Sequence, residues 1–162
     1  MAQIEREPER LMGNAACPSP KSALVPIEVR VGLEEDVPFI VSTWTASMRG
    51  VYPNRYAHDY WPRMTEAVRA HVDRANTIVA YLSEFPAEIV AYLVFLRRRD
   101  IIIAHFAYTK DLARRQGHVR TLLALANPDR LPLSFTQPAR NENVMEHLCR
   151  SAIFCPQLWQ ET

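Results

Sequence analysis

The sequence predicts a mixed α/β (α+β) domain with its elements in the order β-α-α-β-β-β-α-β-α-β. Apolar residues recur at helical spacing in two segments near the start of the chain and in two shorter segments later on. Short apolar runs bounded by turn residues stand between them, as is typical of strands. Three of these runs follow one another directly. We therefore expect a mostly antiparallel central sheet flanked by about four helices, and neither a doubly wound sheet nor a barrel.

Composition narrows the class of protein further. The chain has 162 residues, 48% of them hydrophobic and 23% charged, which suits a single globular domain with a core. Its net charge of +1 argues against nucleic acid as a partner. Cys17, Cys149 and Cys155 are too scattered for a disulfide framework or a zinc site, so no metal is expected. With no apolar signal segment and no membrane-length apolar run, we expect no contact with a membrane and a cytoplasmic setting.

The first part of the chain predicts an arm, a strand and a helix. Residues 1–25 mix charges with prolines and a glycine, and are expected to form a flexible N-terminal arm ahead of one domain, 26–162. Ile27–Val31 alternates apolar and polar side chains, as a strand does. Glu34–Arg49 follows with helical spacing, and Gly50 is expected to end this helix.

The second helix is predicted at Asp59–Arg74, after a loop at Val51–His58. Its apolar stripe consists of Trp61, Met64, Val68 and Val72. His71 borders this stripe, and we expect a packed histidine there rather than a ligand.

Three strand-like runs come next. Thr77–Leu82 and Ala87–Leu96 flank the turn Ser83–Pro86 and predict an antiparallel hairpin. Arg97–Asp100 is a charged turn, expected to be solvated, and it leads into a third run at Ile101–Thr109.

The stretch His105–Leu123 (HFAYTKDLARRQGHVRTLL) combines the end of a strand, a basic loop with one glycine, and the start of a helix predicted at His118–Ala126. Free backbone N–H groups and the positive end of the helix dipole meet in such a junction, so the stretch predicts an anion site. A short strand at Leu131–Thr136, a last helix at Asn141–Ala152 and a terminal strand at Ile153–Cys155 complete the predicted elements.

The loop and the element order together resemble the GNAT superfamily of acyl-CoA-dependent N-acetyltransferases. Arg114-Arg115-Gln116-Gly117-His118-Val119 is similar to the family's loop pattern Gln/Arg-x-x-Gly-x-Gly/Ala. The segment VRVGLEEDVPFI resembles the first strand and acidic turn of the family. The resemblance extends from about Ile27 to Phe154 and implies a GNAT-like sheet and an N-acetyltransferase.

In this family the glycine loop binds the pyrophosphate of coenzyme A, so the resemblance implies acetyl-CoA as co-substrate. Backbone N–H groups of Arg115–Arg120 would surround the pyrophosphate, and Gly117 would let the backbone approach closely. The pantetheine arm would lie along the strand at Ala107–Thr109. The implied cofactor contacts are Ala107, Tyr108, Thr109, Arg114, Arg115, Gln116, Gly117, His118, Val119 and Arg120. The alternative is an ordinary strand–helix junction that contains a glycine.

Acetyl transfer to an amine needs a base, a polarised carbonyl and an acid for the leaving thiolate. His105 is the candidate base, because the resemblance places it on the strand beside the thioester. Strand alternation puts it on the same face as Ala107 and Thr109. The alternative is a histidine that is hydrogen-bonded within a half-buried sheet. Cys149 or Tyr108 would supply the acid.

The acceptor pocket of this family lies partly between the first two helices. Tyr52, Tyr56 and Trp61 fall there, and they either line a substrate site or pack against one another. The acceptor would be an amine of a small molecule or of a protein, and a homodimer is compatible with this interpretation.

A second interpretation is a GNAT-fold protein without catalysis that acts as a binding or structural component, for example of a phage particle or a host-takeover complex. Val119 stands where the family usually has Gly or Ala, and Cys149 stands where it often has a tyrosine acid. This interpretation implies a larger assembly in the host cytoplasm or in a virion. A third, a nucleic-acid binder that uses Arg97–Arg99 with the loop arginines, is weak at a net charge of +1.

Overall fold

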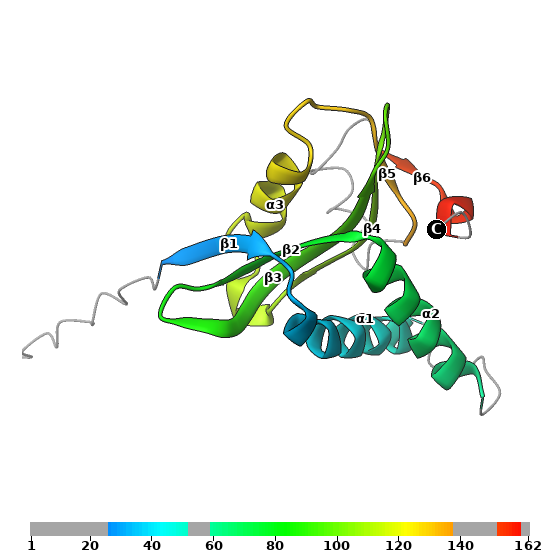
Figure 1. Ribbon diagram of the computed structural model, residues 1–162, viewed down its shortest axis with the longest axis horizontal. Coiled ribbons are helices and arrows are strands. Elements are labelled where there is room, and N and C mark those ends of the chain that lie inside the picture. The colour runs from blue at the N-terminus through cyan, green and yellow to red at the C-terminus, as the bar shows by residue number, and fades with distance from the viewer. Residues whose placement is uncertain (1–25, 52–58, 138–151, 160–162) are drawn as a thin grey trace, which may run out of the picture.

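The computed structural model describes residues 26–51, 59–137 and 152–159. Within these ranges, the chain forms six strands, three α-helices and three short 3₁₀ helices (Figure 1). In chain order they are β1 (Ile27–Val31), η1 (Glu34–Asp36), α1 (Val37–Val51), α2 (Tyr60–Arg74), β2 (Asn76–Leu82), β3 (Phe85–Arg97), β4 (Ile102–Thr109), η2 (Asp111–Ala113), α3 (His118–Ala126), β5 (Leu133–Phe135), β6 (Ile153–Phe154) and η3 (Pro156–Trp159). The predicted arm and nearly all of the predicted last helix lie outside the described residues.

The strands form one mixed sheet in the spatial order β1-β2-β3-β4-β5-β6. The pairs from β1 to β4 are antiparallel, whereas β5 runs parallel to β4 and β6 runs parallel to β5. The predicted mixed, mostly antiparallel sheet is therefore confirmed. β5 pairs with only the first three residues of β4, Ile102–Ala104. The rest of β4 keeps its partner on the β3 side alone within the described residues.

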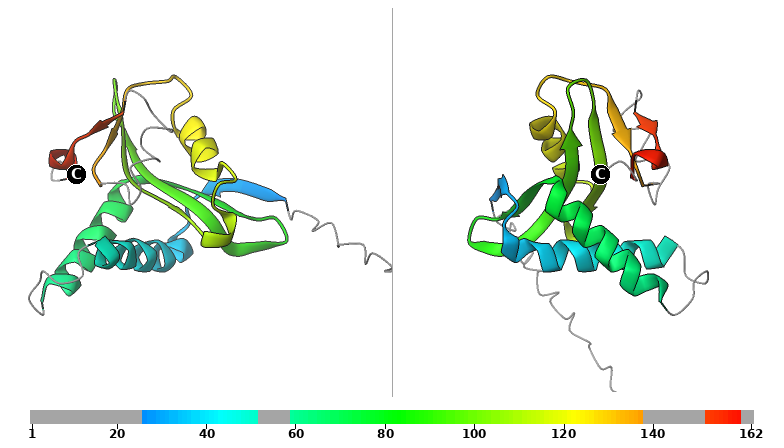
Figure 2. Two further views of the ribbon diagram at one scale, coloured as in Figure 1. Left: turned by 180° about the vertical axis from the view of Figure 1, so that it is seen from behind. Right: turned by 45° about the vertical axis from the view of Figure 1, so that its right-hand side comes forward.

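The helices cover both faces of the sheet, as the views in Figures 1 and 2 show. α1 and α2 pack on one face, where the fully buried Trp44 lies in a core with Val68, Tyr92 and Val94. α3 packs on the other face, where Leu122 inserts among Leu93, Phe95 and Ile102. Burial of these apolar side chains is the main force that holds the three layers together.

The turn between β1 and α1 is fixed by one carboxylate. Asp36 is 4% exposed, accepts the Leu33 N–H at 2.7 Å and forms an ion pair with Arg30 (Nη2 to Oδ1, 2.9 Å). Burial alone would raise the pKa of Asp36, but the Arg30 guanidinium and the Leu33 amide hold this pKa below its usual value. The predicted helix at Glu34–Arg49 therefore begins as the 3₁₀ helix η1, and α-helical geometry starts at Val37.

Most predicted boundaries are off by one or two residues, and the predicted helix end at Gly50 and turn at Ser83–Pro86 are wrong. Gly50 does not end the first helix, because α1 continues to Val51. The turn after β2 consists of Ser83 and Glu84 alone, and β3 already includes Phe85 and Pro86. Pro86 is tolerated there because the β2–β3 ladder is irregular at this end, pairing Tyr81 with Ile89 and then Leu82 with Phe85.

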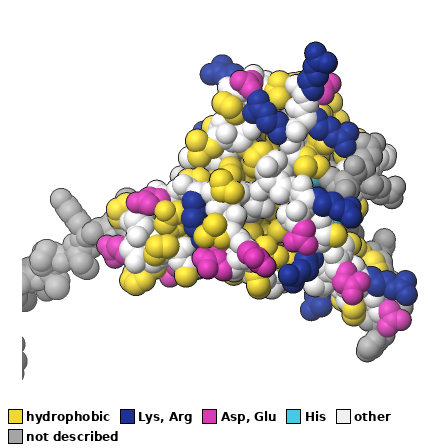
Figure 3. Space-filling model, viewed as in Figure 1, with side chains coloured by type: hydrophobic (Ala, Val, Ile, Leu, Met, Phe, Trp, Pro, Cys, Tyr) yellow, Lys and Arg dark blue, Asp and Glu magenta, His cyan; other side chains and the backbone are white. Residues whose placement is uncertain are grey.

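Charges of both signs are spread over the surface. Figure 3 shows Lys and Arg side chains at the upper end of the molecule, where the β3–β4 hairpin turns, and acidic side chains along the lower edge. Arg97 in this hairpin forms an ion pair with Asp129, so the predicted charged turn is in part tied to the loop after α3. Among the described helices, none has the length and apolar character needed to cross a membrane.

Two glycines give opposite expectations for alanine substitution. Gly32 donates its N–H to the Thr77 carbonyl at 2.8 Å, and a Cβ at this position would lie 2.9 Å from both Cβ and Cγ2 of Thr77. We predict that Gly32→Ala lowers the free energy of unfolding by about 1–3 kcal/mol. Gly50→Ala, on an exposed helical position, should instead raise it by roughly 0.5–1 kcal/mol. Urea unfolding of both variants checks this, and equal effects would contradict the packing at Gly32.

Candidate active site

His105 is the extra residue of a β-bulge in β4. Ala104 pairs with Phe95 and Phe106 pairs with Val94, so no residue of β3 stands opposite His105. A bulge shifts the alternation of side chains, and bulges are common beside active sites. The predicted common face of His105, Ala107 and Thr109 is therefore wrong: Ala107 packs against the α3-side core, whereas the His105 ring contacts the His71 ring of α2 (centroids 5.4 Å apart).

The His105 side chain is buried and bonded on one nitrogen only. It is 1% exposed, and its Nδ1 lies 3.2 Å from the Thr136 hydroxyl oxygen. The Thr136 hydroxyl can donate its hydrogen to the His105 carbonyl oxygen at 3.5 Å. The hydroxyl oxygen then acts as acceptor towards the ring, so we place the ring proton on Nδ1. Nε2 then carries the free lone pair, and among the described residues it has no hydrogen-bond partner.

His105 is held in its neutral form by its surroundings. Burial lowers its pKa to about 4, and the electrostatic effects of His71 and Arg98 act in the same direction. A neutral imidazole with an unshared Nε2 lone pair can accept a proton, which is the property that a general base requires.

An aromatic group surrounds the ring of His105 on the α1–α2 side of the sheet. His71 stacks on Trp159 with centroids 3.7 Å apart, and Trp159 also meets His105 edge-on at 6.1 Å. Trp44 stacks on Phe106 at 4.9 Å and contacts Trp159 edge-on at 5.5 Å. The prediction that His71 is a packed histidine is confirmed.

Beyond the bulge, the backbone of β4 turns hydrogen-bonding groups away from β3. Lys110 donates its N–H to the Val90 carbonyl at 2.9 Å, so Lys110 belongs to a hydrogen-bonded pair. In an antiparallel ladder such pairs alternate, which directs the backbone groups of Ala107 and Thr109 to the opposite side. β5 has already diverged there, since its pairing ends at Ala104. An extended ligand can therefore hydrogen-bond to Ala107 and Thr109 as an added strand would.

The loop that follows β4 has the geometry of an anion site. Arg115 and Gly117 adopt positive φ values of 65° and 85°, and Gly117 is the N-cap of α3. Residues with positive φ at a helix start turn successive N–H groups in one direction, and the first N–H groups of the helix have no acceptor within it. Within the loop and first turn, the Thr121 N–H is bonded to the Gly117 carbonyl at 3.0 Å.

The side chains of this loop leave its backbone accessible. A Cβ at Gly117 would meet no atom within 4 Å, so the space in front of the helix start is open. Arg114 is exposed and paired with Asp111 at 2.6 Å, and Arg115 and Arg120 are exposed. Val119 packs towards the α3-side core, so its branched side chain faces the sheet.

The other predicted residues lie elsewhere or outside the described part. Trp61 is half-buried against the α1–α2 core, with the Arg49 guanidinium 5.1 Å from its ring centroid. Tyr52, Tyr56 and Cys149 lie outside the described residues. No group of three or more His, Cys, Asp or Glu side chains in the described ranges could hold a metal.

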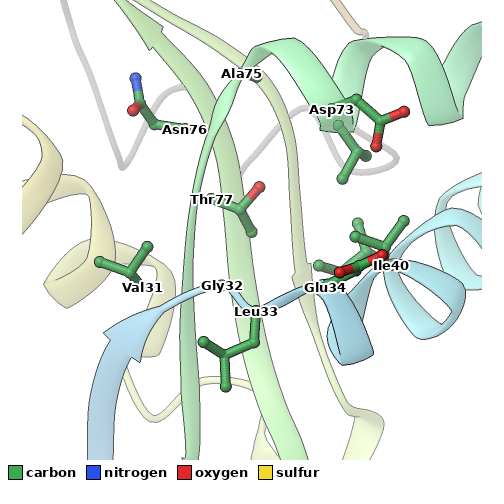
Figure 4. Close-up of a pocket in the computed structure, with 11 residues that line it drawn as sticks. Val31, Gly32, Leu33, Glu34, Ile40, Asp73, Ala75, Asn76 and Thr77 are labelled. Atoms are coloured by element: carbon green, nitrogen blue, oxygen red, sulfur yellow. The ribbon is translucent and has the colours of Figure 1, made fainter.

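A pocket of about 310 Å³ lies apart from His105 and the glycine loop (Figure 4). The connections β1–η1 and α2–β2 form it, and Leu33, Glu34, Asp73 and Asn76 are among its lining residues. None of the described residues that line it belongs to the predicted cofactor or acceptor set.

Comparison with known proteins identifies the architecture. No protein-family model and no curated protein sequence matches the chain. Among solved structures, a possible acetyltransferase from Clostridium difficile 630 has a TM-score of 0.54 at 15% identity, covering 75% of this chain and 86% of that one. A candidate acetyl transferase from Pyrococcus furiosus has a TM-score of 0.57 at 12% identity, covering 75% and 89%. The chain has the GNAT fold. At such low identities this likeness concerns the fold alone.

Two residues that contact His105, Thr136 and Trp159, were not predicted from the sequence. Thr136, which orients the ring, follows a three-residue strand and carries no local signal. Trp159 lies near the end of the chain, 88 residues from its hydrogen-bond partner His71. A tryptophan after Pro156 was the one feature of the sequence that could have drawn attention to this segment.

The state of His105 gives a pH prediction. The unfolded chain protonates this ring near the ordinary pKa of 6.5, whereas the folded chain does so only near 4. Stability due to this group is therefore complete above pH 7 and decreases as the pH falls through this window, by about 2 kcal/mol between pH 7.5 and 5. Urea unfolding should show this loss in the wild type and not in His105→Asn, and NMR should show a His105 midpoint near 4. Equal pH slopes for the two proteins would contradict the buried, neutral ring.

Proposed function

We propose that the chain is an acyl-CoA-dependent N-acetyltransferase that transfers an acetyl group from acetyl-CoA to an amine. The observation that carries this proposal is a continuous strand–loop–helix unit. Within the described residues it presents, in order, a histidine whose Nε2 has no hydrogen-bond partner (His105), backbone groups that face away from β3 beyond the last pair with β5 (Ala107 and Thr109), and an open helix N-terminus (Gly117). The GNAT fold supports it, because the structures that share this fold include the two acetyltransferase candidates above.

Each part of this unit would have one task. The positive-φ loop and the first turn of α3 would bind the pyrophosphate, with Arg114, Arg115 and Arg120 adding charge-assisted contacts. Backbone groups of Ala107 and Thr109 would orient the pantetheine arm and polarise the thioester carbonyl. When bound, acetyl-CoA supplies an activated acetyl group.

His105 would remove the proton of the attacking amine. Its Nε2 would accept the proton while Nδ1 stays bonded to Thr136, which fixes the ring orientation. The acid for the thiolate would be Tyr108 or Cys149. Tyr108 is half-buried and stacks on Tyr92 at 5.3 Å. Trp61, with Tyr52 and Tyr56, remains the proposed acceptor wall.

A second candidate function is that of a GNAT-fold binding or structural component, in a larger assembly or a virion, without catalysis. One observation favours it: His105 lies beneath Trp159 and has a pKa of about 4, which makes it a weak base as it stands. Such a protein would bind no acetyl-CoA, or would bind it without releasing thiol.

Calorimetry with acetyl-CoA and with CoA tests the loop. We predict binding by the wild type, and a loss of roughly tenfold or more in Gly117→Glu, because a carboxylate would repel the pyrophosphate at the helix N-terminus. Gly117→Asn is the conformational control, since asparagine tolerates positive φ and adds no charge. Arg99→Gln, in the β3–β4 turn, removes one positive charge far from the loop and should bind as the wild type does. No binding by the wild type at millimolar ligand would exclude the enzyme.

A thiol-release assay with a panel of amines tests the base. His105→Asn should keep the contact to Thr136 and lose Nε2, so we predict a fall in turnover of about 10²–10⁴-fold with unchanged acetyl-CoA binding. Turnover equal to that of the wild type would remove His105 as the base. Binding without turnover by the wild type towards every amine would favour the second candidate function.

A further inference from the structure

The Nε2 atom of His105 is buried, yet it has no hydrogen-bond partner among the described residues. The whole residue is 1% exposed. Buried polar atoms in proteins are nearly always hydrogen-bonded, so an orphaned one calls for an explanation. A base that must reach an acceptor amine cannot work from such a position.

Two described elements, α2 through His71 and the 3₁₀ helix η3, meet the His105 ring on the α1–α2 side of the sheet. The last residue of η3, Trp159, lies edge-on to the His105 ring at 6.1 Å and stacks on the His71 ring at 3.7 Å. η3 follows β6, at the far end of the sheet from β1 (Figures 1 and 2). The cover over His105 therefore comes from the last described segment of the chain.

His71 ties η3 to α2 through both of its ring nitrogens. Nδ1 lies 2.9 Å from the Ala67 carbonyl oxygen within α2, and Nε2 lies 2.8 Å from the Trp159 carbonyl oxygen. Carbonyl oxygens only accept, so both contacts are hydrogen bonds when both nitrogens carry protons.

η3 is anchored at its start and held at its tip by side chains. The Cys155 N–H donates to the Phe135 carbonyl of β5 at 2.8 Å, which fixes the start. The tip is held by the His71 bond, the His71 stack and the Trp44 edge contact. Breaking these tip contacts would let η3 swing about Cys155 without unpairing the sheet.

We propose that η3 is a cover that closes His105 off from acceptor amines, with His71 as the positioning residue that holds Trp159 in place. That the excluded molecule is an acceptor amine rests on the proposed function. The closure of His105 by η3 does not depend on the proposed function. The closed state leaves Nε2 buried and without a hydrogen-bond partner among the described residues, which costs free energy, while the aromatic stack and the His71 bond offset that cost. Opening hydrates Nε2 and removes the burial that depresses the pKa of His105, so the open ring is the better base.

Chemical modification of histidine measures the closure directly. Diethyl pyrocarbonate reacts with the unprotonated imidazole, and at pH 7 His105 is neutral, so access alone limits its reaction. We expect mass spectrometry to show His105 modified slowly in the wild type, and roughly tenfold faster or more in Trp159→Ala and in His71→Phe. His71→Phe keeps a ring for the stack and loses both hydrogen bonds. Equal rates in the wild type and both variants would overturn the cover.

Two controls separate opening from unfolding. His118, half-exposed at the start of α3, serves as a reference in the same samples and should react at an unchanged rate. Phe85→Ala removes another large aromatic side chain, 59% exposed at the β2–β3 turn, and should leave His105 protected. Should Trp159→Ala fail to fold, hydrogen exchange of the wild type decides. Amides of 157–159, beyond the anchor at Cys155, should exchange faster than those of β3, and exchange of both segments only through global unfolding would overturn the cover.

Measuring thiol release by the same variants separates the proposed cover from the proposed acetyl transfer. If His105 becomes reactive in Trp159→Ala but no variant turns over acetyl-CoA, the cover stands and the proposed acetyl transfer fails. If the wild type turns over acetyl-CoA and His105 is as reactive as His118 from the outset, acetyl transfer stands and the cover fails.

Discussion

The site depends on the β-bulge at His105, where no residue of β3 stands opposite the histidine. β4 must pair with β3 along its whole length, yet it keeps β5 for only three residues. The bulge at His105 lies where β5 stops, and it turns the histidine towards α2 while the next alanine packs under α3. One extra residue thus places an imidazole on one face of the sheet, next to backbone groups of β4 that no described strand pairs with beyond the end of β5. Both are needed if a thioester and an amine are to meet there.

The glycine loop connects the end of β4 to the start of α3. β4 leads out of a tightly packed sheet, and the chain has to enter α3 with its N–H groups facing solvent. Positive φ values at Arg115 and Gly117 achieve that turn. Glycine adopts this geometry at little cost, whereas Arg115 does so against its preference. The burial of the α3 residues Leu122 and Leu123 against the sheet offsets this cost.

Local patterns sufficed where one element determines the outcome. β1 and α3 begin and end at the predicted residues, because alternation and helical spacing are unambiguous there. The bulge could not be predicted, since it depends on how β3 and β4 pair and not on the sequence of β4. Gly50 failed as a helix end because α1 runs through it to Val51 without a positive φ, and a single glycine weakens a helix without necessarily ending it. His105 was identified as a candidate base from its strand position, but its burial beneath a tryptophan 54 residues later lies beyond any local rule.

The closed site also explains how His105 can be a weak base in this structure and still be the proposed general base. A neutral ring with a pKa of about 4 is a poor acceptor for the proton of an ammonium group. The main cause of that low pKa is burial, and on the α2 side the His105 ring meets the rings of His71 and Trp159, which contact one another through side chains and not through sheet pairing. Contacts of this kind open locally at a lower free energy than a strand does. The weak basicity of His105 therefore belongs mainly to the closed conformation, and the pKa of the ring would rise towards the ordinary imidazole value when η3 moves away.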